Sequence, residues 1–234
     1  MDWNRTCVAV IPCFNEAARI RRVVMAVRKY LPHVTVVDDG SADVTAANAK
    51  SAGAEVLRLP KNSGKGAALR HGWQHAHKLG FQWILMLDGD GQHDADEIPR
   101  FLACAERTGA ALVVGNRMNN SAAMPFLRRQ VNRWMSWKIS QLTGRELPDT
   151  QCGFRLAHLE TLLQLPLHAN RFEIESAMLA AFLAAGEKVE FVPIRTLYDC
   201  GASHINPLTD TFRWLRWCLA QRPALRACST IRVP

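Results

Sequence analysis

Two aspartates separated by one glycine form the stretch of this sequence best suited to chemistry. Asp88 and Asp90 follow an apolar run, Trp83 to Leu87, which predicts a buried strand that ends where the carboxylates begin. Residues i and i+2 of extended backbone point the same way, so both carboxylates face one side. Two neighbouring negative charges favour a cation between them, and oxygen ligands suit Mg²⁺ or Mn²⁺. The pattern predicts a divalent metal that holds the phosphates of a nucleotide.

Two other interpretations of this stretch were weighed. A calcium loop of the EF-hand type needs Gly at its sixth position and Glu at its twelfth, where this chain has His93 and Pro99. That class is excluded. A solvated surface turn rich in Asp and Gly is the simpler alternative for the motif taken alone. The other motifs of the sequence therefore decide between a metal site and a solvated turn.

Composition restricts the classes of protein and of partner. The chain has 234 residues, 48% of them hydrophobic and 21% charged, which predicts one globular domain. Seven scattered cysteines predict a reducing compartment, and the longest apolar run, 177–185, is too short to span a bilayer. With no secretory leader, we expect a cytoplasmic protein, with peripheral contact to the cytoplasmic membrane face as an option. The net charge of +8 favours anionic partners, although no nucleic-acid motif is present.

Strand and helix patterns alternate along the first half of the chain. Strands are expected at 6–11, 33–37, 55–58, 83–87 and 110–114, and helices at 15–30, 67–79 and 95–107, with a short helix after Ser41. Such alternation predicts an α/β fold with a mostly parallel central sheet and helices on both faces.

Polar residues recur where these strands end. Ligands of such sheets bind beyond the carboxyl ends of the strands, so the convergence of several strand ends on one rim favours a binding site over a chance surface turn. The residues placed there are Asn15, Glu16, Asp38, Asp39, Lys65, Asp88, Asp90 and Arg117.

The second half has a different character. A small-residue linker, 119–123, precedes a predicted helix at 125–142, and further helices are expected at 171–185 and 210–221, with a short one after Arg155 and a strand at 188–198. We expect a single domain, 1–234, whose residues 1–117 bind nucleotide and whose residues 118–234 bind an acceptor. The aromatic and basic residues of 210–221 predict either an interfacial helix on anionic lipid or a helix docked on the core.

At this point the sequence resembles the family-2 glycosyltransferases of the GT-A fold, and is closest in pattern to dolichyl-phosphate mannose synthase and polyprenyl-phosphate glycosyltransferases. The resemblance covers nearly the whole chain. It is carried by Val10-Ile-Pro-Cys-Phe-Asn-Glu16, Asp38-Asp-Gly-Ser41, Lys65-Gly66, Asp88-Gly-Asp-Gly-Gln92, Asp149-Thr-Gln-Cys-Gly-Phe-Arg155, Ser203-His-Ile-Asn-Pro207 and Asp210-Thr211.

The resemblance implies a donor site for a nucleotide sugar. Its residues would be Pro12, Asn15, Glu16, Asp38, Asp39, Lys65, Gly66 and Asp88, with Ser203 and His204 reaching the pyrophosphate from a C-terminal loop. Asn15 could instead cap a helix, and Lys65 could be solvated, since the full phosphate-loop pattern is missing. His204 could likewise be an ordinary surface residue.

The same resemblance implies metal-dependent transfer with inversion, although the residues alone do not exclude retention. The metal motif is Asp88, Asp90 and Gln92: the last two would bind the ion, and Asp88 would face the ribose or sugar. The ion and Arg117 would neutralise the departing nucleoside diphosphate. Asp90 and Arg117 are therefore the expected catalytic residues.

A basic helix is expected to bind the acceptor. Arg128, Arg129 and Arg133 are adjacent or one turn apart, with Asn132 beside them, and can direct two guanidiniums at one anion, for which a polyprenyl phosphate is preferred. A phosphate needs no general base. Transfer to a hydroxyl of a lipid or glycan is the alternative and needs one. Asp149 is the first candidate, unless it only forms a turn. The second candidates, Glu173 and Glu175, are otherwise expected to pair with Arg155 or Arg171.

Other classes fit less well. Gln130-Val-Asn-Arg-Trp134 matches a string of processive polysaccharide synthases, but no Glu-Asp pair lies between Glu97 and Gln130, so we interpret the match as coincidence. A nucleotidyltransferase would carry a Gly-rich, Arg-containing loop near Pro12, and a Rossmann oxidoreductase a Gly-x-Gly-x-x-Gly turn. A non-catalytic nucleotide-sugar sensor would not need Asp88, Asp90 and Arg117 intact. The nucleotide base, the sugar and the oligomeric state stay open.

Overall fold

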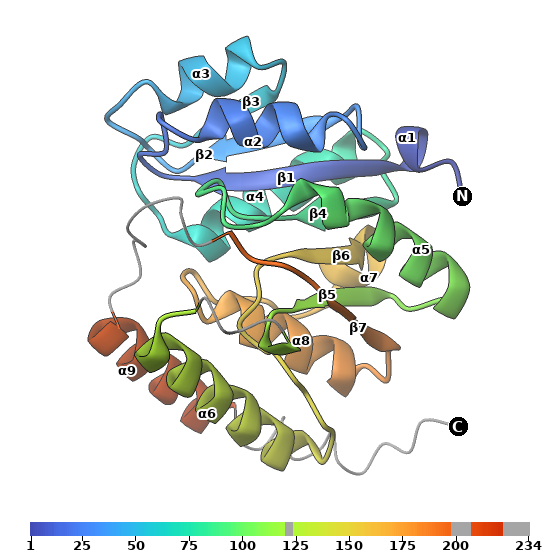
Figure 1. The fold of residues 1–234 in the computed structure, drawn as a ribbon, viewed down its shortest axis with the longest axis vertical. Coiled ribbons are helices and arrows are strands. Elements are labelled where there is room, and N and C mark those ends of the chain that lie inside the picture. Colours follow the sequence, from blue (N-terminus) through green and yellow to red (C-terminus); the bar gives the residue numbers. More distant parts are fainter. Residues whose placement is uncertain (120–123, 198–206, 222–234) are drawn as a thin grey trace.

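A seven-stranded sheet organises the chain (Figure 1). The computed structural model describes residues 1–119, 124–197 and 207–221. The strands stand in the order β3-β2-β1-β4-β6-β5-β7. Their bounds are β1 Cys7–Cys13, β2 Val34–Asp38, β3 Glu55–Arg58, β4 Trp83–Met86, β5 Leu112–Asn116, β6 Arg155–His158 and β7 Val189–Pro193.

Helices cover both faces of this sheet, as the alternating pattern predicts. From β1 through β2 to β3, each strand is added on the same side of the preceding one, and the chain then crosses back to place β4 on the other side of β1. Because crossovers between parallel strands are right-handed, the returning helix α4 (Lys65–Lys78) lies on the face opposite α2 and α3. The other helices are α1 Trp3–Thr6, α2 Ile20–Val27, α3 Thr45–Ser51, the 3₁₀ turn η1 Ala95–Glu97, α5 Ile98–Thr108, α6 Phe126–Thr143, α7 Leu159–Gln164, α8 Ile174–Ala184 and α9 Pro207–Ala220.

The mostly parallel α/β prediction is confirmed, but one strand was missed. β6 pairs antiparallel with both β4 and β5, in the middle of the sheet, where only a short helix was expected. Its four residues, Arg-Leu-Ala-His, are too few to show a period, and Arg155 is charged yet 1% exposed. The helix expected at 15–30 is also shorter and begins at Ile20, because Asn15 is held in a left-handed turn (φ 56°).

The antiparallel strand matters for function because of where its first residue lies. Met86 at the end of β4 pairs with Arg155 at the start of β6, so the segment before β6 reaches the same rim as the carboxyl ends of the parallel strands. At the same rim Cys13 of β1 pairs with Asp38 of β2. The fold therefore brings the 149–155 motif to the rim where the donor motifs end.

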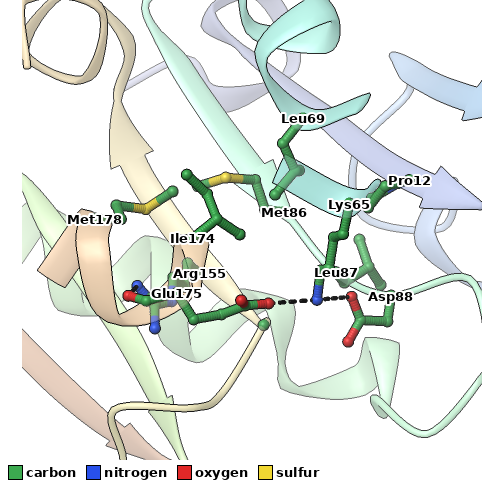
Figure 2. A pocket seen from close by; sticks show the side chains of 11 residues that line it. Pro12, Lys65, Leu69, Met86, Leu87, Asp88, Arg155, Ile174, Glu175 and Met178 are labelled. Carbon is green, nitrogen blue, oxygen red and sulfur yellow. Dashed lines mark hydrogen bonds and ion pairs between the residues drawn. The ribbon is translucent and has the colours of Figure 1, made fainter. Parts of the chain in front are cut away.

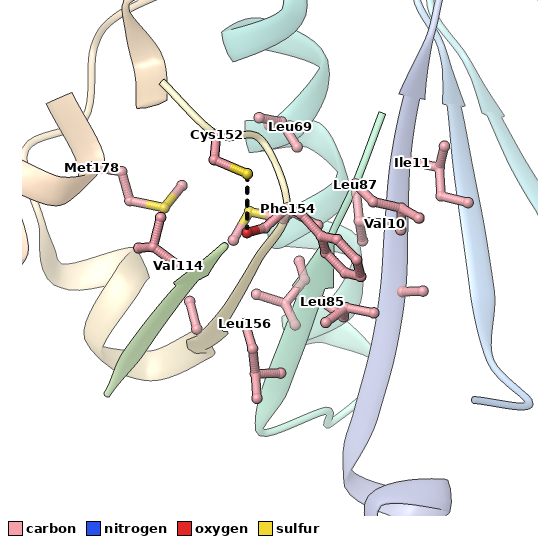
Figure 3. Packing of buried hydrophobic residues seen from close by; sticks show 14 of the residues in the cluster. Val10, Ile11, Leu69, Leu85, Leu87, Val114, Cys152, Phe154, Leu156 and Met178 are labelled. Atoms are coloured by element: carbon pink, nitrogen blue, oxygen red, sulfur yellow. Dashed lines mark hydrogen bonds between the residues drawn. The ribbon is translucent and has the colours of Figure 1, made fainter. Parts of the chain in front are cut away.

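The core holds these strands in place. Leu85, Leu156 and Val114 lie on three neighbouring strands, and all three are fully buried (Figure 3). Phe154, just ahead of β6, stacks on Phe101 of α5 with ring centroids 4.3 Å apart. Burial of such aliphatic and aromatic side chains stabilises a protein by roughly 1.5–3 kcal/mol each. The motif before β6 is thus anchored by an aromatic contact at its base.

Candidate active site

The Asp88-Gly-Asp90 turn packs against the end of β1. A side chain at Gly89 would place its Cβ 2.4 Å from Cys13 Sγ, so only glycine allows this approach. Gly91 adopts a left-handed conformation (φ 74°), and the Gln92 amide donates to Asp90 Oδ1 at 2.9 Å. The sequence prediction that this turn closes a buried strand at the rim is confirmed.

Lys65 lies between two carboxylates, one from each half of the chain (Figure 2). Its Nζ contacts Asp88 and, at 2.5 Å, Glu175 Oε1 of α8. Gly153 makes room for this arrangement, since a Cβ there would lie 2.8 Å from Lys65 Nζ and 2.9 Å from Asp88 Oδ2. Sequence reasoning did not foresee this bridge: it considered Glu175 either as a second candidate for a general base or as a partner of Arg155 or Arg171.

The charges of this cluster stabilise one another. Burial lowers the pKa of Lys65, but the carboxylates of Asp88 and Glu175 outweigh it and leave that pKa above its ordinary value. Burial raises the pKa of Asp88, but Lys65 and then His93 outweigh it and hold that pKa well below its usual range. Lys65 is therefore cationic and Asp88 anionic at neutral pH.

Among the side chains of this turn, the Asp90 carboxylate is the one most available to a hard divalent cation. Asp90 is partly exposed, and its only hydrogen bond within the described chain is the one from the Gln92 amide. Asp88 is already engaged by Lys65 and His93, and Gln92 Oε1 accepts from Arg128 Nη1 at 3.3 Å. Among the residues the structure describes, no three His, Cys, Asp or Glu side chains form a group that could hold a metal. Asp90 is thus the ligand best placed for an ion, with Gln92 beside it.

A cavity of about 410 Å³ opens beside this turn. It contains six of the predicted residues: Pro12, Glu16, Asp39, Lys65, Asp88 and Asp90. It also contains residues that the sequence did not single out, among them Phe14, Asn62, Arg171 and Phe172. Arg171 and Phe172 were expected inside the helix predicted at 171–185, but the observed helix α8 begins at Ile174, so both lie just before it.

Three other predicted donor residues, Asp38, Asn15 and Gly66, do not line the cavity. Asp38 is fully buried, accepts from the Ser41 amide at 2.9 Å and lies 3.3 Å from Arg58 Nε. Asn15 Oδ1 accepts from the Ala42 amide at 3.0 Å, so it does not cap a helix. Asp39, although it lines the cavity, accepts from the Ser63 and Gly64 amides at 2.7 and 2.8 Å.

The third of these, Gly66, packs against the backbone that precedes α8. Gly66 lies in the first turn of α4, and a Cβ there would be 2.2 Å from the Ala169 carbonyl oxygen. The next amide, that of Ala67, donates to the Asn170 carbonyl at 3.2 Å. The amino end of α4 is therefore covered by the backbone of 169–170 and offers Gly66 no room for a phosphate.

A second cavity, of about 330 Å³, lies against α6, α8 and α9. Arg117, Arg128 and Asn132 of the predicted set line it, together with Glu173 and Glu175. Its apolar residues are Leu127, Val131, Met135, Phe172 and Trp214. Arg129 is absent from its lining, and Arg133 lines a separate open groove beside Arg145. The prediction that Arg133 joins an acceptor site is not supported by this geometry.

Arg117 and Asp149 form a buried ion pair at the edge of the second cavity. Arg117 Nε donates to Asp149 Oδ2 at 2.7 Å and Nη2 to Oδ1 at 2.9 Å, and backbone amides of Arg117 and Gln151 donate at 3.1 Å. Burial raises the pKa of Asp149, but Arg117 outweighs it, and the pKa stays below its ordinary value. Asp149 is fully buried and no part of the cavity wall. A carboxylate held in this way orients Arg117 and is badly placed to act as a general base.

The two cavities meet at four residues that line both. These are Lys65, Asp88, Arg128 and Phe172. Lys65 and Asp88 belong to the first half of the chain, and Arg128 and Phe172 to the second. The remaining predicted contacts, Ser203 and His204, lie outside the described residues.

A comparison with known families identifies this arrangement. The family model described as glycosyl transferase family 2 matches residues 8–163. The chain belongs to this family. It is a glycosyltransferase, and the resemblance found in the sequence motifs is confirmed.

Individual relatives of this glycosyltransferase carry lipid-phosphate names. The dodecaprenyl-phosphate galacturonate synthase of Rhizobium johnstonii is 30% identical, over 87% of this chain and 62% of that protein. The undecaprenyl-phosphate mannosyltransferase of Micrococcus luteus is 29% identical, over 80% of this chain and 82% of that protein. Among solved structures, glucosyl-3-phosphoglycerate synthase of Mycobacterium tuberculosis with Mn²⁺ and UDP-glucose superposes with a TM-score of 0.73 at 22% identity, over 93% of this chain and 79% of that one. That likeness confirms the GT-A fold.

Proposed function

We propose that this glycosyltransferase moves a sugar from a nucleotide-sugar donor to a polyprenyl phosphate, with a divalent metal and with inversion at the anomeric carbon. The observation that carries the proposal is the junction of the two cavities at Lys65, Asp88, Arg128 and Phe172. Residues 1–117 would bind the donor and residues 118–234 would supply most of the acceptor site. The names of relatives 29–30% identical favour a lipid phosphate over other acceptors.

The wall of the second cavity suits a phosphate joined to an apolar chain. Arg117 and Arg128 supply cationic donors, whereas Leu127, Val131 and Trp214 supply apolar surface. A phosphate monoester is ionised near neutral pH, so its oxygen can attack without a general base. Burial of Asp149 beneath Arg117 agrees with this route. In the alternative route, to a hydroxyl acceptor, Glu173 is the base candidate that lines the cavity and is only partly buried.

A bound Mg²⁺ or Mn²⁺ would neutralise charge on the departing nucleoside diphosphate. Asp90 would hold it, with Gln92 beside it, and Asp88 would stay paired with Lys65 near the sugar. Arg128, which reaches Gln92 and lines both cavities, is placed to bind a phosphate of either substrate. Arg117 and Arg128 would thus place positive charge on the acceptor side of the expected reacting atoms.

Peripheral contact with an anionic membrane would bring a lipid acceptor to the second cavity. Trp214 and Cys218 of α9 are buried, and Trp214 Nε1 donates to Ser176 of α8 at 2.8 Å, so α9 docks on the core. Other apolar residues of α6 and α9, beside arginines, face outward: Phe126, Leu127, Trp134, Trp137, Phe212 and Leu219. In the described part of the chain no helix is long and apolar enough to cross a bilayer. We propose that these outward residues rest on the cytoplasmic face of a membrane.

The deciding experiment combines purified protein, Mn²⁺, a panel of UDP- and GDP-sugars and undecaprenyl phosphate in detergent. We expect release of free nucleoside diphosphate with one donor and formation of a sugar-phosphate lipid. Product formation with undecaprenol, but not with its phosphate, would favour the hydroxyl route, and so would a strong loss of activity in Glu173→Gln. Co-sedimentation with vesicles that contain phosphatidylglycerol, compared with phosphatidylcholine alone, tests the membrane contact. If the protein sediments with neither kind of vesicle, the proposed membrane contact is contradicted.

A further inference from the structure

The transferred sugar must lie where the two cavities meet, if the proposed function holds. Its anomeric carbon is bonded to the donor diphosphate on one side and is attacked by the acceptor from the other. Lys65, Asp88, Arg128 and Phe172 line both cavities, and Glu175 lies behind Lys65 on the acceptor side. The names of the relatives include mannose and galacturonate, so family membership alone does not decide which sugar this chain takes.

Two hydrogen-bonding groups at this junction are unfilled. The ammonium of Lys65 has three N–H donors, and the described residues accept two of them, through Asp88 and Glu175. Glu175 Oε1 takes one of these bonds at 2.5 Å, whereas its Oε2 is buried with no hydrogen-bond partner in the described structure. Glu175 is 5% exposed, so water does not compensate from the surface.

A water molecule in the small space beside Lys65 does not satisfy the Glu175 carboxylate either. The small space beside the pair, drawn in Figure 2, has a volume of about 10 Å³, and Leu69, Met86 and Ile174 are among the residues that line it. A space this small and apolar is a poor site for water. The larger open space that Glu175 lines is the second cavity.

We propose that Lys65 and Glu175 together bind one hydroxyl of the transferred sugar and select a neutral hexose over a hexuronate. A hydroxyl accepts from the third N–H of Lys65 and donates to Glu175, and so fills both groups at once. In a hexuronate whose carboxylate takes the place of this hydroxyl, no proton is left to donate, and a negative charge faces Glu175. Oε2 is covered by protein atoms, so contact requires a rotation of the Glu175 carboxylate toward the cavity.

The test is a thermodynamic cycle, in which the Glu175 side chain and one sugar hydroxyl are removed separately and together, and the losses of binding are compared. Binding of UDP-glucose, GDP-mannose and their monodeoxy analogues is measured by calorimetry with Mn²⁺, for the wild type and Glu175→Gln. For the preferred donor, we expect one deoxy analogue to bind the wild type roughly 10–100-fold more weakly. Glu175→Gln should weaken the parent donor by a similar factor and show no further loss with that analogue. Its preference for UDP-glucose over UDP-glucuronate should fall by the same factor.

Controls separate this inference from a folding defect and from failure of the proposed function. Thermal unfolding of Glu175→Gln and Glu175→Asp monitors the fold, and Glu160→Gln on the exposed side of α7 removes an equal charge elsewhere. Additive losses in the cycle, or an unchanged hexose preference, would overturn the inference. If UDP or GDP binds the wild type as tightly as every nucleotide sugar, the inference alone fails. If no nucleotide binds, the donor-site proposal fails with it.

Discussion

The proposed donor side and the proposed acceptor side of this glycosyltransferase hold their polar side chains by different means. On the donor side, the carboxylates of Asp38 and Asp39 accept from backbone amides within 25 residues of themselves. On the proposed acceptor side, Arg117 reaches Asp149 across 32 residues, and Lys65 at the start of α4 reaches Glu175 at the start of α8. Hydrogen bonds to amides tolerate changes in nearby charge, whereas a buried ion pair fails when one partner is removed. The acceptor side should therefore be the more sensitive to single charge deletions.

Removal of the proposed metal ligand should give the largest loss of activity with little loss of stability. Asp90 is partly exposed and makes one hydrogen bond, so Asp90→Ala leaves no buried charge behind. We expect kcat/KM to fall by about 10³ or more, since charge stabilisation of the leaving group is lost. Asp96→Ala, an exposed aspartate of η1, is the matched control. Steady-state assays and thermal unfolding with and without Mn²⁺ measure both effects, and a Mn²⁺-dependent shift that survives Asp90→Ala would contradict the assignment.

Breaking the acceptor-side ion pair should damage both activity and fold. Arg117→Leu leaves the fully buried Asp149 carboxylate without its cation. We expect the free energy of unfolding to fall by about 3–5 kcal/mol, measured by urea denaturation. Asp38→Asn on the donor side keeps an acceptor for the Ser41 amide, so it should cost less. Equal losses in the two variants would remove the proposed difference between the two sides.

Acid should weaken the same pair. The pKa of Asp149 is lower in the folded chain than its ordinary value, so its contribution to stability is complete above that ordinary value, about 4, and is lost as pH falls toward the folded pKa. Wild-type unfolding free energy should thus decrease below about pH 4. Asp149→Asn should be less stable at neutral pH and show a shallower decrease in acid. Urea denaturation at a series of pH values tests this, and parallel pH curves for the two proteins would contradict it.

A methyl group at the junction should impair catalysis more than folding. In Gly153→Ala the new Cβ would lie within 2.9 Å of both Lys65 Nζ and Asp88 Oδ2, two side-chain ends that can shift. Displacement by a fraction of an ångström costs little stability, but misplacement of reacting groups by about 1 Å can cost about 10²-fold in rate. We expect a loss of 10–100-fold in kcat/KM with a near-normal unfolding midpoint. Gly109→Ala, at a left-handed helix end (φ 68°) remote from the site, should do the opposite: it strains the backbone and lowers stability but leaves kcat/KM near normal.

The sequence predicted the proposed donor side better than the proposed acceptor side. The donor rim was predictable because carboxyl ends of parallel strands converge, so Asp88, Asp90 and Lys65 could be placed together without tertiary information. Their exact partners could not be placed in the same way. Asp38 looked like a ligand contact because a buried carboxylate that binds backbone amides has the same sequence signature as one that binds a nucleotide.

The acceptor side depends on packing that no local pattern contains. β6 is four residues long and antiparallel, and its leading Arg155 is buried by donating to the backbone carbonyls of Thr150, Cys152 and Glu175. The rotation of α6 about its axis also decides which arginine faces the cavity. Helical spacing alone made Arg128, Arg129 and Arg133 equal candidates, and only the docking of α6 separated them.

The smallest expected effect tests that separation directly. Arg128 lines both cavities and donates to Gln92, whereas Arg133 lines the outer groove beside Arg145. Arg128→Met should raise the KM for polyprenyl phosphate about tenfold, the loss expected for one charged hydrogen bond of about 1.5 kcal/mol. Arg133→Met removes the same charge from the same helix and should change that KM less than about twofold in detergent, where no membrane surface contributes. If the two variants lose acceptor affinity equally, the acceptor phosphate responds to the overall positive charge of α6, and the second cavity is not its specific site.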